Sequence, residues 1–300
     1  MSLNKKNAEI KKGLGIDIGG TKISYALIDK NGNFLNEVKK IQTPKTKDEI
    51  FQTLKNIIKE FEDEILFTAL ATAGAVNLDN TGVLGSTANM PKGYRDIIFK
   101  DLSDKPVFIE NDANCAAWAE YKIGASKGYK NSVMLTFGTG VGGGFIINGK
   151  LLRGKSGMAG EVHFAMSRKK ERQCTCGAWD CFEAYASGNG LKKTAIEIVK
   201  DENITTYDVM DGVKAKDENY LKAYEIWQHD VELGVLSFAN IFDPDCFVLS
   251  GSMEKFLDVD RIEKFVNSHT LTSPTKVFHA KAGNWAGMIG AVLLAFHKFD

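Results

Sequence analysis

Apolar positions near the start of the chain predict three successive strands. Residues 14–19 and 22–29 are rich in isoleucine and leucine, and the Asn31-Gly32 pair that follows favours a hairpin turn. The segment 34–41 is therefore expected to form a third strand.

A change of period then predicts helices that alternate with strands. From 47 to 65 the apolar residues recur on one helical face, whereas 66–72 is a continuous apolar run typical of a strand buried on both faces. Residues 106–110 predict a further strand that leads into a helix over 112–123. Hairpin strands followed by strand–helix units indicate a mixed sheet flanked by helices.

The second half of the chain opens in the same way, with two strands joined through glycines. The expected elements are strands at 132–140 and 143–149, helices at 182–199 and 218–241, a strand at 247–250 and a closing helix at 285–299.

Because each half begins with a glycine-bearing hairpin, the sequence predicts two similar α/β lobes with a cleft between them. At about 150 residues per domain, the chain is long enough for two cores. We expect an N-terminal lobe at 1–118 and a C-terminal lobe at 119–285, with a final helix at about 286–300 that packs back on the first lobe.

Composition narrows the classes of function. The 300 residues include 38 basic and 38 acidic side chains, and this formal net charge of zero argues against a dedicated nucleic-acid binder. We see no apolar run of the roughly 18 residues that a membrane span needs, and the first fifteen residues hold no apolar signal segment. A cytoplasmic protein with neither nucleic acid nor membrane as partner is expected.

Two glycine-rich turns are candidates for phosphate binding. Asp17, Gly19, Gly20, Thr21 and Lys22 lie at the turn between the first two strands, where backbone N–H groups could approach an anion and Asp17 could hold a metal ion or its waters. The alternative is a tight hairpin whose glycines only provide positive φ.

The second glycine-rich turn lies between the two predicted strands that open the second half of the chain. Five of the seven residues 138–144 are glycine, more than a structural turn needs, so a backbone nest for a second phosphate region is the better account. Its candidate residues are Gly138, Thr139, Gly140 and Gly142. Two such hairpins would clamp the phosphates of one nucleotide.

A cluster of thiols predicts a metal site. Cys174, Cys176 and Cys181 together with His163 make a tetrahedral ligand set of the structural zinc type. A buried group of small apolar thiols is the alternative, but the charged residues 168–172 indicate a solvated loop nearby.

The chain resembles a known family over nearly its whole length: the ROK sugar kinases and repressors, within the actin/hexokinase/Hsp70-like ATPase fold. The resemblance is carried, in the family's order, by the Asp17 turn, the Glu110–Asn114 segment, the 138–144 loop, the cysteine cluster and the 243–251 segment. It implies an α/β fold class of two ribonuclease-H-like lobes with an interdomain cleft.

The resemblance also implies a mechanism. Taken alone, Asp112 before a helix is most simply an N-cap, but in the family this segment is catalytic and Asp112 would be the general base toward a sugar hydroxyl. ATP and Mg²⁺ are the implied cofactors with a structural Zn²⁺, and Gly251 would lie near the adenine. The implied sugar-binding residues are Gly74, Asn89, Asn111, Asp112, Glu161, His163 and Glu183.

Two departures from the family pattern affect the site. One residue is missing between Glu161 and His163, which puts the sugar contact of Glu161 in doubt. Asp180 replaces a glycine of the cysteine motif, and aspartate tolerates a left-handed backbone better than most residues.

The sequence leaves the substrate open. Glucose, phosphorylated at O6, is the first expectation, before fructose, mannose and N-acetylated hexosamines, and the family implies a homodimer. A sugar-responsive repressor is the rival class, which we disfavour because only sixteen residues precede Asp17 and leave no room for a helix-turn-helix. A sugar-binding ATPase without transfer is the third alternative.

Overall fold

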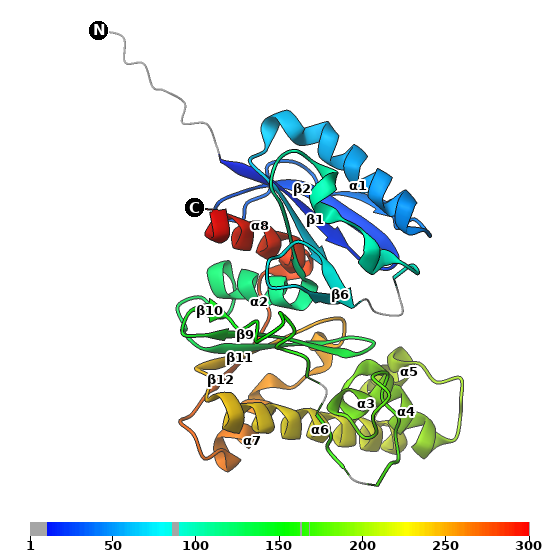
Figure 1. Cartoon of the computed structure of the whole chain (residues 1–300). Coiled ribbons are helices and arrows are strands. Elements are labelled where there is room, and N and C mark those ends of the chain that lie inside the picture. Colours follow the sequence, from blue (N-terminus) through cyan, green and yellow to red (C-terminus); the bar gives the residue numbers. More distant parts are fainter. Residues whose placement is uncertain (1–10, 86–89, 163, 168, 300) are drawn as a thin grey trace. The chain divides into compact units, whose positions relative to one another are not determined.

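Residues 11–85, 90–162, 164–167 and 169–299 are described by the structure, a computed structural model. Asn89 and His163 lie outside the described residues. The chain separates into two units, the first made of Met1–Ile123, Arg153–Met158 and Ala282–Asp300, and the second of Gly124–Leu152 and Ala159–Lys281. Each unit is described by itself below (Figure 1).

The first unit is a five-stranded sheet with helices on both faces, in the strand order β3-β2-β1-β4-β7. The first two pairings are antiparallel and the last two parallel. Its elements are β1 (Lys12–Ile18), β2 (Lys22–Asp29), β3 (Lys39–Gln42), α1 (Lys47–Phe61), β4 (Thr68–Thr72), the short hairpin β5 (Ala75–Val76) and β6 (Val83–Gly85), β7 (Val107–Asn111), α2 (Asp112–Ile123) and α8 (Ala286–Phe299).

The alternation of side chains along β1 decides what lies on each face of this sheet. Leu14, Ile16 and Ile18 share a buried core with the apolar face of α1. On the opposite face, a Cβ at Gly15 would lie 2.7 Å from the Met288 side chain, so glycine allows α8 to pack directly on the strand. The same alternation places Asp17, like Gly15, on the face of the sheet that packs against α8.

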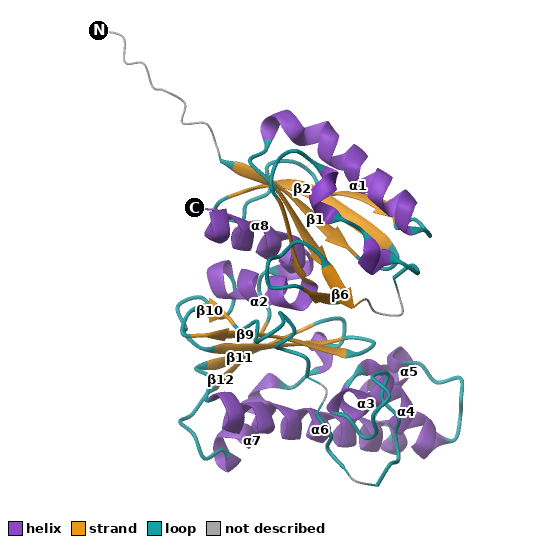
Figure 2. Cartoon of the chain, viewed as in Figure 1, coloured by secondary structure: helices purple, strands orange, loops and turns teal. Residues whose placement is uncertain are grey.

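The second unit repeats this sheet, with the order β10-β9-β8-β11-β12 and the same sequence of antiparallel and parallel pairings. The prediction of two similar α/β lobes is therefore confirmed. Its elements, coloured by type in Figure 2, are β8 (Ser132–Phe137), β9 (Val141–Ile147), β10 (Lys150–Leu151), α3 (Phe182–Ala186), α4 (Gly188–Val199), α5 (Thr206–Lys214), α6 (Glu218–Phe242), β11 (Cys246–Ser250), α7 (Val259–His269) and β12 (Lys276–His279).

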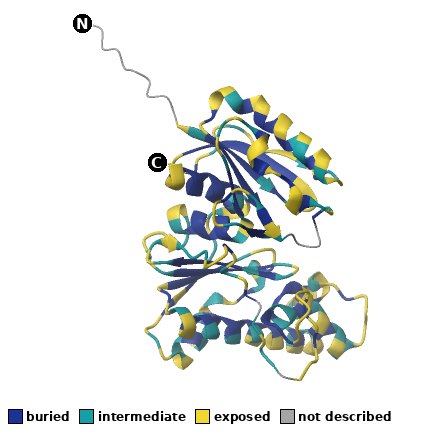
Figure 3. Ribbon diagram, viewed as in Figure 1, coloured by how far each residue is buried: buried dark blue, intermediate teal, exposed yellow. Residues whose placement is uncertain are grey.

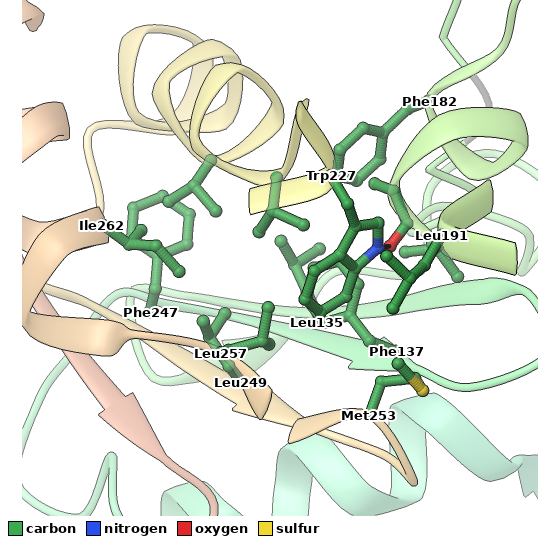
Figure 4. Close-up of a cluster of buried hydrophobic side chains, with 14 of the residues drawn as sticks. Leu135, Phe137, Phe182, Leu191, Trp227, Phe247, Leu249, Met253, Leu257 and Ile262 are labelled. Atoms are coloured by element: carbon green, nitrogen blue, oxygen red, sulfur yellow. Dashed lines mark hydrogen bonds between the residues drawn. The ribbon is translucent and has the colours of Figure 1, made fainter. Parts of the chain in front are cut away.

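The core of the second unit lies between its sheet and the long helix α6. Trp227 of α6 is fully buried among aliphatic and aromatic side chains (Figure 4), and its indole N–H donates to the carbonyl of Ala186 at 2.8 Å. A buried indole N–H usually finds a partner of this kind, and this bond ties the end of α3 to α6. In both units the strands and the inner faces of the helices are the buried parts (Figure 3).

The third strand is shorter than predicted. The segment 34–41 contributes only an isolated bridge between Ile28 and Phe34 before β3 begins at Lys39. The reason is local, since the side chain of Asn36 accepts a hydrogen bond from the backbone N–H of Leu27 at 2.7 Å and replaces a strand carbonyl there.

The helix predicted at 182–199 is two helices. Ser187 leaves the helical conformation (φ −75°, ψ 171°) and caps α4 by accepting from the N–H of Gly190 at 3.1 Å. The break lets the N–H of Gly188 donate to the carbonyl of Gly138 at 2.8 Å, a contact the helical period does not reveal.

The other predicted elements are found within a few residues of their expected bounds, but the sequence reasoning missed the short strands β5, β6 and β10 as well as α5, α7 and β12. Cys115 and Cys246 are buried, as expected of thiols outside the cluster. Among the helices of the described residues, none combines the length and the apolar character needed to cross a membrane.

Candidate active site

Two carboxylates of the first unit lie close enough to interact. Asp17 is the half-buried penultimate residue of β1, and Asp112 is the first residue of α2, directly after β7. Burial raises the pKa of Asp17 to about 6, the negative charge of Asp112 adds to the rise, and the Lys22 ammonium opposes it. The first unit therefore concentrates negative charge at this point.

Asn111, rather than Asp112, caps helix α2. Its side-chain oxygen accepts a hydrogen bond from the N–H of Asn114 at 3.0 Å, in the geometry of an N-cap to the third helical residue. The interpretation of Asp112 as an N-cap is thus wrong. The Asp112 carboxylate, which accepts from the N–H of Ala113 at 2.9 Å, is placed at the positive end of the helix.

The candidate sugar-binding residues of the first unit converge on the same segment. Asn111 Nδ2 donates to the carbonyl of Gly74 at 3.0 Å, and Gly74 has a left-handed backbone with φ of 102°. Tyr94, which the sequence reasoning did not single out, is buried with its hydroxyl 2.7 Å from Thr72 Oγ1. Burial raises the pKa of Tyr94 and the Asp112 charge adds to the effect, so this hydroxyl is a neutral group near Asp112.

The turn after β1 opens onto a cavity of about 320 Å³. The turn is closed by a hydrogen bond from Gly19 N–H to the carbonyl of Lys22 at 3.0 Å and is braced by Thr43, whose hydroxyl donates to the carbonyl of Gly19 at 2.6 Å. Gly20 and Thr21 line the cavity, where their backbone groups can meet an anion.

The glycine loop of the second unit also lines a cavity, of about 180 Å³. The N–H of Gly138 donates to the carbonyl of Gly140 at 2.9 Å, which leaves Thr139 at the tip, whereas Gly142 pairs with Thr136 inside the sheet. Gly251 has φ of 95°, and a Cβ there would overlap the carbonyl of Phe137. The cavity is lined by Gly138, Thr139, Gly188, Asn189, Thr206, Tyr207, Ser252, Met253 and Phe256.

The amino end of α4 borders this cavity, and the sequence reasoning missed it. Gly188 and Asn189 occupy the first turn of α4, whose partial positive charge favours phosphate groups. The available signal was the Ser187-Gly188-Asn189-Gly190 run, typical of a helix start inside an otherwise helical pattern.

Glu183 connects the glycine loop to the cysteine loop. Its Oε2 accepts from the N–H of Val141 at 3.0 Å, and its Oε1 accepts from the Thr175 hydroxyl at 2.6 Å and from Cys174 Sγ at 3.6 Å. Of the other candidates in this unit, Glu161 is exposed and is followed by the buried Val162.

The three cysteines fit a zinc ion. The sulfur atoms of Cys174, Cys176 and Cys181 lie within 4.8 Å of one another, and those of Cys176 and Cys181 are 3.6 Å apart. Tetrahedral Zn–S bonds of about 2.3 Å put sulfurs about 3.8 Å apart. Without a metal, burial and the neighbouring Cys176 raise the pKa of Cys181 to about 12, so zinc must displace protons to bind.

Asp180 organises the loop that carries these cysteines. It adopts φ of 55°, as expected for a residue in the place of glycine, and its buried carboxylate accepts backbone N–H bonds from Lys170, Glu171 and Arg172 at 2.7–3.0 Å. The bond from Arg172 is the largest of the effects that hold the pKa of Asp180 down to about 2.

Residues 169–171 are exposed, as expected of a solvated loop, but Arg172 departs from the expectation for 168–172. Its side chain is buried, and it donates to Thr194 Oγ1 at 3.0 Å and pairs with Glu197 at 2.7 Å. The Arg172 side chain thus points inward and anchors the loop on α4.

Known proteins are similar to this chain in sequence and in fold. A glucokinase of Streptomyces coelicolor is 31% identical over 94% of this chain and 96% of its own length, and an N-acetylmannosamine kinase of Salmonella heidelberg is 30% identical over 94% and 97%. The structure of a ROK family glucokinase from Streptomyces griseus, in complex with glucose and AMPPNP, superposes with a TM-score of 0.78 at 29% identity and covers 95% of this chain and 99% of that one.

Two lobes of identical strand order, each with a glycine turn after its first strand, define the actin-like ATPase fold, as the resemblance implied. The profile of the ROK family matches residues 13–298. The chain therefore belongs to the ROK family. Its enzyme class is that of an ATP-dependent sugar kinase.

Proposed function

We propose that this kinase phosphorylates a hexose hydroxyl, with glucose O6 as the first acceptor and Asp112 as the general base. The observation that carries the proposal is the position of Asp112 at the start of α2, where Asn111 performs the capping. A carboxylate in this position keeps its charge near a helix N-terminus and presents it beside the candidate sugar-binding residues Asn111 and Gly74.

The step is a phosphoryl transfer. A hydroxyl oxygen of the sugar attacks the γ-phosphorus, the bond from that phosphorus to the β–γ bridging oxygen breaks, and ADP leaves. Asp112 accepts the hydroxyl proton as the new P–O bond forms. Because such a reaction depends mainly on alignment, a base of ordinary carboxylate strength is sufficient.

The acidic pair fits a divalent cation. Burial and, after it, the negative charge of Asp112 raise the pKa of Asp17, and a cation beside the pair would favour the charged form. In the proposal Asp17 holds Mg²⁺ directly or through water, and the ion, when bound, neutralises charge on the transferred phosphoryl group.

The nucleotide phosphates are assigned to the two glycine turns. Gly20 and Thr21 of the first unit and Gly138 and Thr139 of the second each line a cavity, and the start of α4 adds a helix N-terminus to the second. Of the remaining candidates, Gly19 and Gly140 shape these turns, Lys22 offers a positive charge, and Gly251 positions the turn after β11 near the adenine.

Glu183, Glu161, His163 and Asn89 complete the proposed sugar-binding set. Glu183 has the strongest support, because its carboxylate is held between the glycine loop and Thr175. The S. coelicolor and S. heidelberg relatives act on different hexoses, so N-acetylmannosamine is the second candidate acceptor. Cys174, Cys176, Cys181 and His163 are proposed to hold a structural zinc that supports this loop. We further propose a cytoplasmic homodimer.

The deciding experiment is an ATP-consumption screen over glucose, fructose, mannose, N-acetylglucosamine and N-acetylmannosamine, with the phosphorylated position determined by NMR. Asp112→Asn is expected to lower kcat about 10²- to 10⁴-fold while sugar binding by calorimetry persists. Asp96→Asn, at an exposed position of the same unit, is the matched control. An Asp112→Asn variant with wild-type turnover would remove Asp112 from the mechanism, and ATP hydrolysis independent of every sugar would indicate an ATPase without transfer.

A further inference from the structure

Residues 153–158 belong to the first unit, although the chain on both sides of them, through Leu152 and from Ala159, belongs to the second. This six-residue segment, which we call the strap, leaves β10 and leads to Glu161. The contacts of the strap described below are all made with other residues of the first unit.

Arg153 is the main anchor of the strap. Its guanidinium donates to three acceptors of one loop: the carbonyls of Asn77 at 2.7 Å and Leu78 at 2.6 Å, and Asn80 Oδ1 at 3.1 Å. Its Nε forms an ion pair with Glu110 Oε2 at 2.9 Å. A planar guanidinium fork can hold several acceptors in this way, whereas a lysine ammonium cannot.

Glu110 connects Arg153 to the start of α2, the segment that contains Asp112. Its side chain is 1% exposed, and Oε1 accepts from the backbone N–H of Asn111 at 2.8 Å and from Asn114 Nδ2 at 3.2 Å. Its Oε2 accepts from Asn80 Nδ2 at 3.0 Å. Glu110 therefore binds residues that precede and follow Asp112 in the chain, Asn111 and Asn114.

The far end of the strap is fixed as well. A Cβ at Gly157 would overlap the carbonyl of Val76, so the strap backbone lies directly against the loop that Arg153 binds. The strap, the 76–80 loop and the start of α2 thus form one connected polar network inside the first unit.

We propose that Arg153 is a positioning residue for the phosphoryl transfer, because its ion pair with Glu110 fixes the backbone of Asn111 and thereby the direction of the Asp112 carboxylate. The inference rests on the proposed function of Asp112. Removing the guanidinium takes the ion-pair partner from a buried carboxylate, which then relies on the more distant Lys298 charge and on its hydrogen bonds to Asn80, Asn111 and Asn114, so we expect Glu110 and the start of α2 to shift. A small displacement of the Asp112 carboxylate reduces turnover without removing any group that binds substrate.

The test compares Arg153→Met, Arg153→Lys, Glu110→Gln and the double variant Arg153→Met/Glu110→Gln with wild type. Arg153→Met is expected to lower kcat about 10- to 100-fold with little change in the KM for ATP. Arg153→Lys keeps a positive charge beside Glu110 and is therefore expected to recover part of the loss. The double variant removes the unpaired charge, so its loss is expected to be smaller than the product of the two single losses. Equal turnover in Arg153→Met and wild type overturns the inference.

Lys298→Met is the matched control, because Lys298 donates to the carbonyl of Asp79 and to Asn80 Oδ1 in the same loop and acts on Glu110 only through its charge, without the close ion pair that Arg153 makes. Its kcat is expected to stay within about twofold of wild type. A loss as large as that of Arg153→Met would show that general loosening of the loop, and not the Glu110 pair, controls turnover.

Amide hydrogen exchange separates this inference from the proposed function. Arg153→Met is expected to speed exchange at residues 111–116, and Lys298→Met is not. If wild type phosphorylates no sugar, the proposed function fails while the exchange result still tests whether Arg153 holds α2. Unchanged exchange in Arg153→Met contradicts the positioning role whatever the activity.

Discussion

Glu183 Oε2 accepts a hydrogen bond from the backbone N–H of Val141 at 3.0 Å, and a Cβ on the adjacent Gly140 would overlap the same oxygen. The glycine at 140 therefore leaves the space that the Glu183 carboxylate occupies, in addition to any role toward phosphate. The same carboxylate reaches Thr175 of the cysteine loop, so one side chain joins three parts of the second unit.

Gly140→Ala is expected to push the Glu183 carboxylate away and break its bond to Val141. Loss of one such bond to a charged group costs about 1.5–3 kcal/mol, so we expect the sugar KM to rise about tenfold or more with a smaller change in the ATP KM. Gly138→Ala is the control for stability, because its Cβ would meet Ser252 Oγ at an ordinary 3.6 Å. Wild-type sugar KM in Gly140→Ala would show that Glu183 does not contact the sugar.

Asp17→Asn is expected to stabilise the metal-free protein at neutral pH while abolishing efficient turnover. The folded-state pKa of Asp17, about 6, lies above the ordinary 3.8, so between these values the folded protein holds a proton that the unfolded chain has lost. The cost of ionising Asp17 is complete above about pH 7, disappears as the pH falls below about 4, and is at most about 3 kcal/mol.

Thermal or urea unfolding at several pH values checks this prediction. The Tm of Asp17→Asn should exceed that of wild type at about pH 7.5, with the difference shrinking toward about pH 4.5. Asp63→Asn, at an exposed position of the same unit, is the control. A difference that grows as the pH falls would contradict the assignment.

Asp180→Gly restores the residue type of the family motif and is expected to loosen the cysteine loop. The left-handed backbone suits glycine, but the change deletes the acceptor of three backbone N–H groups and of the Tyr185 hydroxyl at 2.7 Å. We expect faster hydrogen exchange over 169–181, with Asp180→Asn intermediate. Because its pKa is held at about 2, the Asp180 contribution is present above about pH 4 and is lost as the pH falls toward 2. Unchanged exchange in Asp180→Gly would mean that another group organises the loop.

Metal analysis tests the cysteine cluster. About one zinc per chain is expected in purified protein. Chelation is expected to remove it and weaken sugar affinity, and the apparent zinc affinity is expected to fall with pH because the thiols must release protons. Cys176→Ser is expected to lose the metal, whereas Cys115→Ala, outside the cluster, keeps it. Full zinc occupancy in Cys176→Ser would exclude Cys176 as a ligand.

The periodic elements of the fold could be predicted from the sequence because their signals are local. The apolar face of α1 and the glycine-bearing hairpins of β1–β2 and β8–β9 gave the two similar lobes, and the motif order gave the family. The short third strand could not be predicted, since it depends on the Asn36 side chain replacing a backbone acceptor. The break at Ser187 had a local signal in the Ser187–Gly190 run, but its contact with Gly138 depends on a partner distant in sequence.

The amino-acid sequence by itself determined the fold class, the family and the residues capable of chemistry, because spacing and residue type suffice for these. The tertiary structure alone decided which of those residues act on one another: that Asn111 rather than Asp112 caps α2, that Arg172 turns inward, and that Arg153 reaches Glu110 from 43 positions away in the chain. Charge pairing and capping depend on distances of a few ångströms, which only the packing of the strands and helices sets.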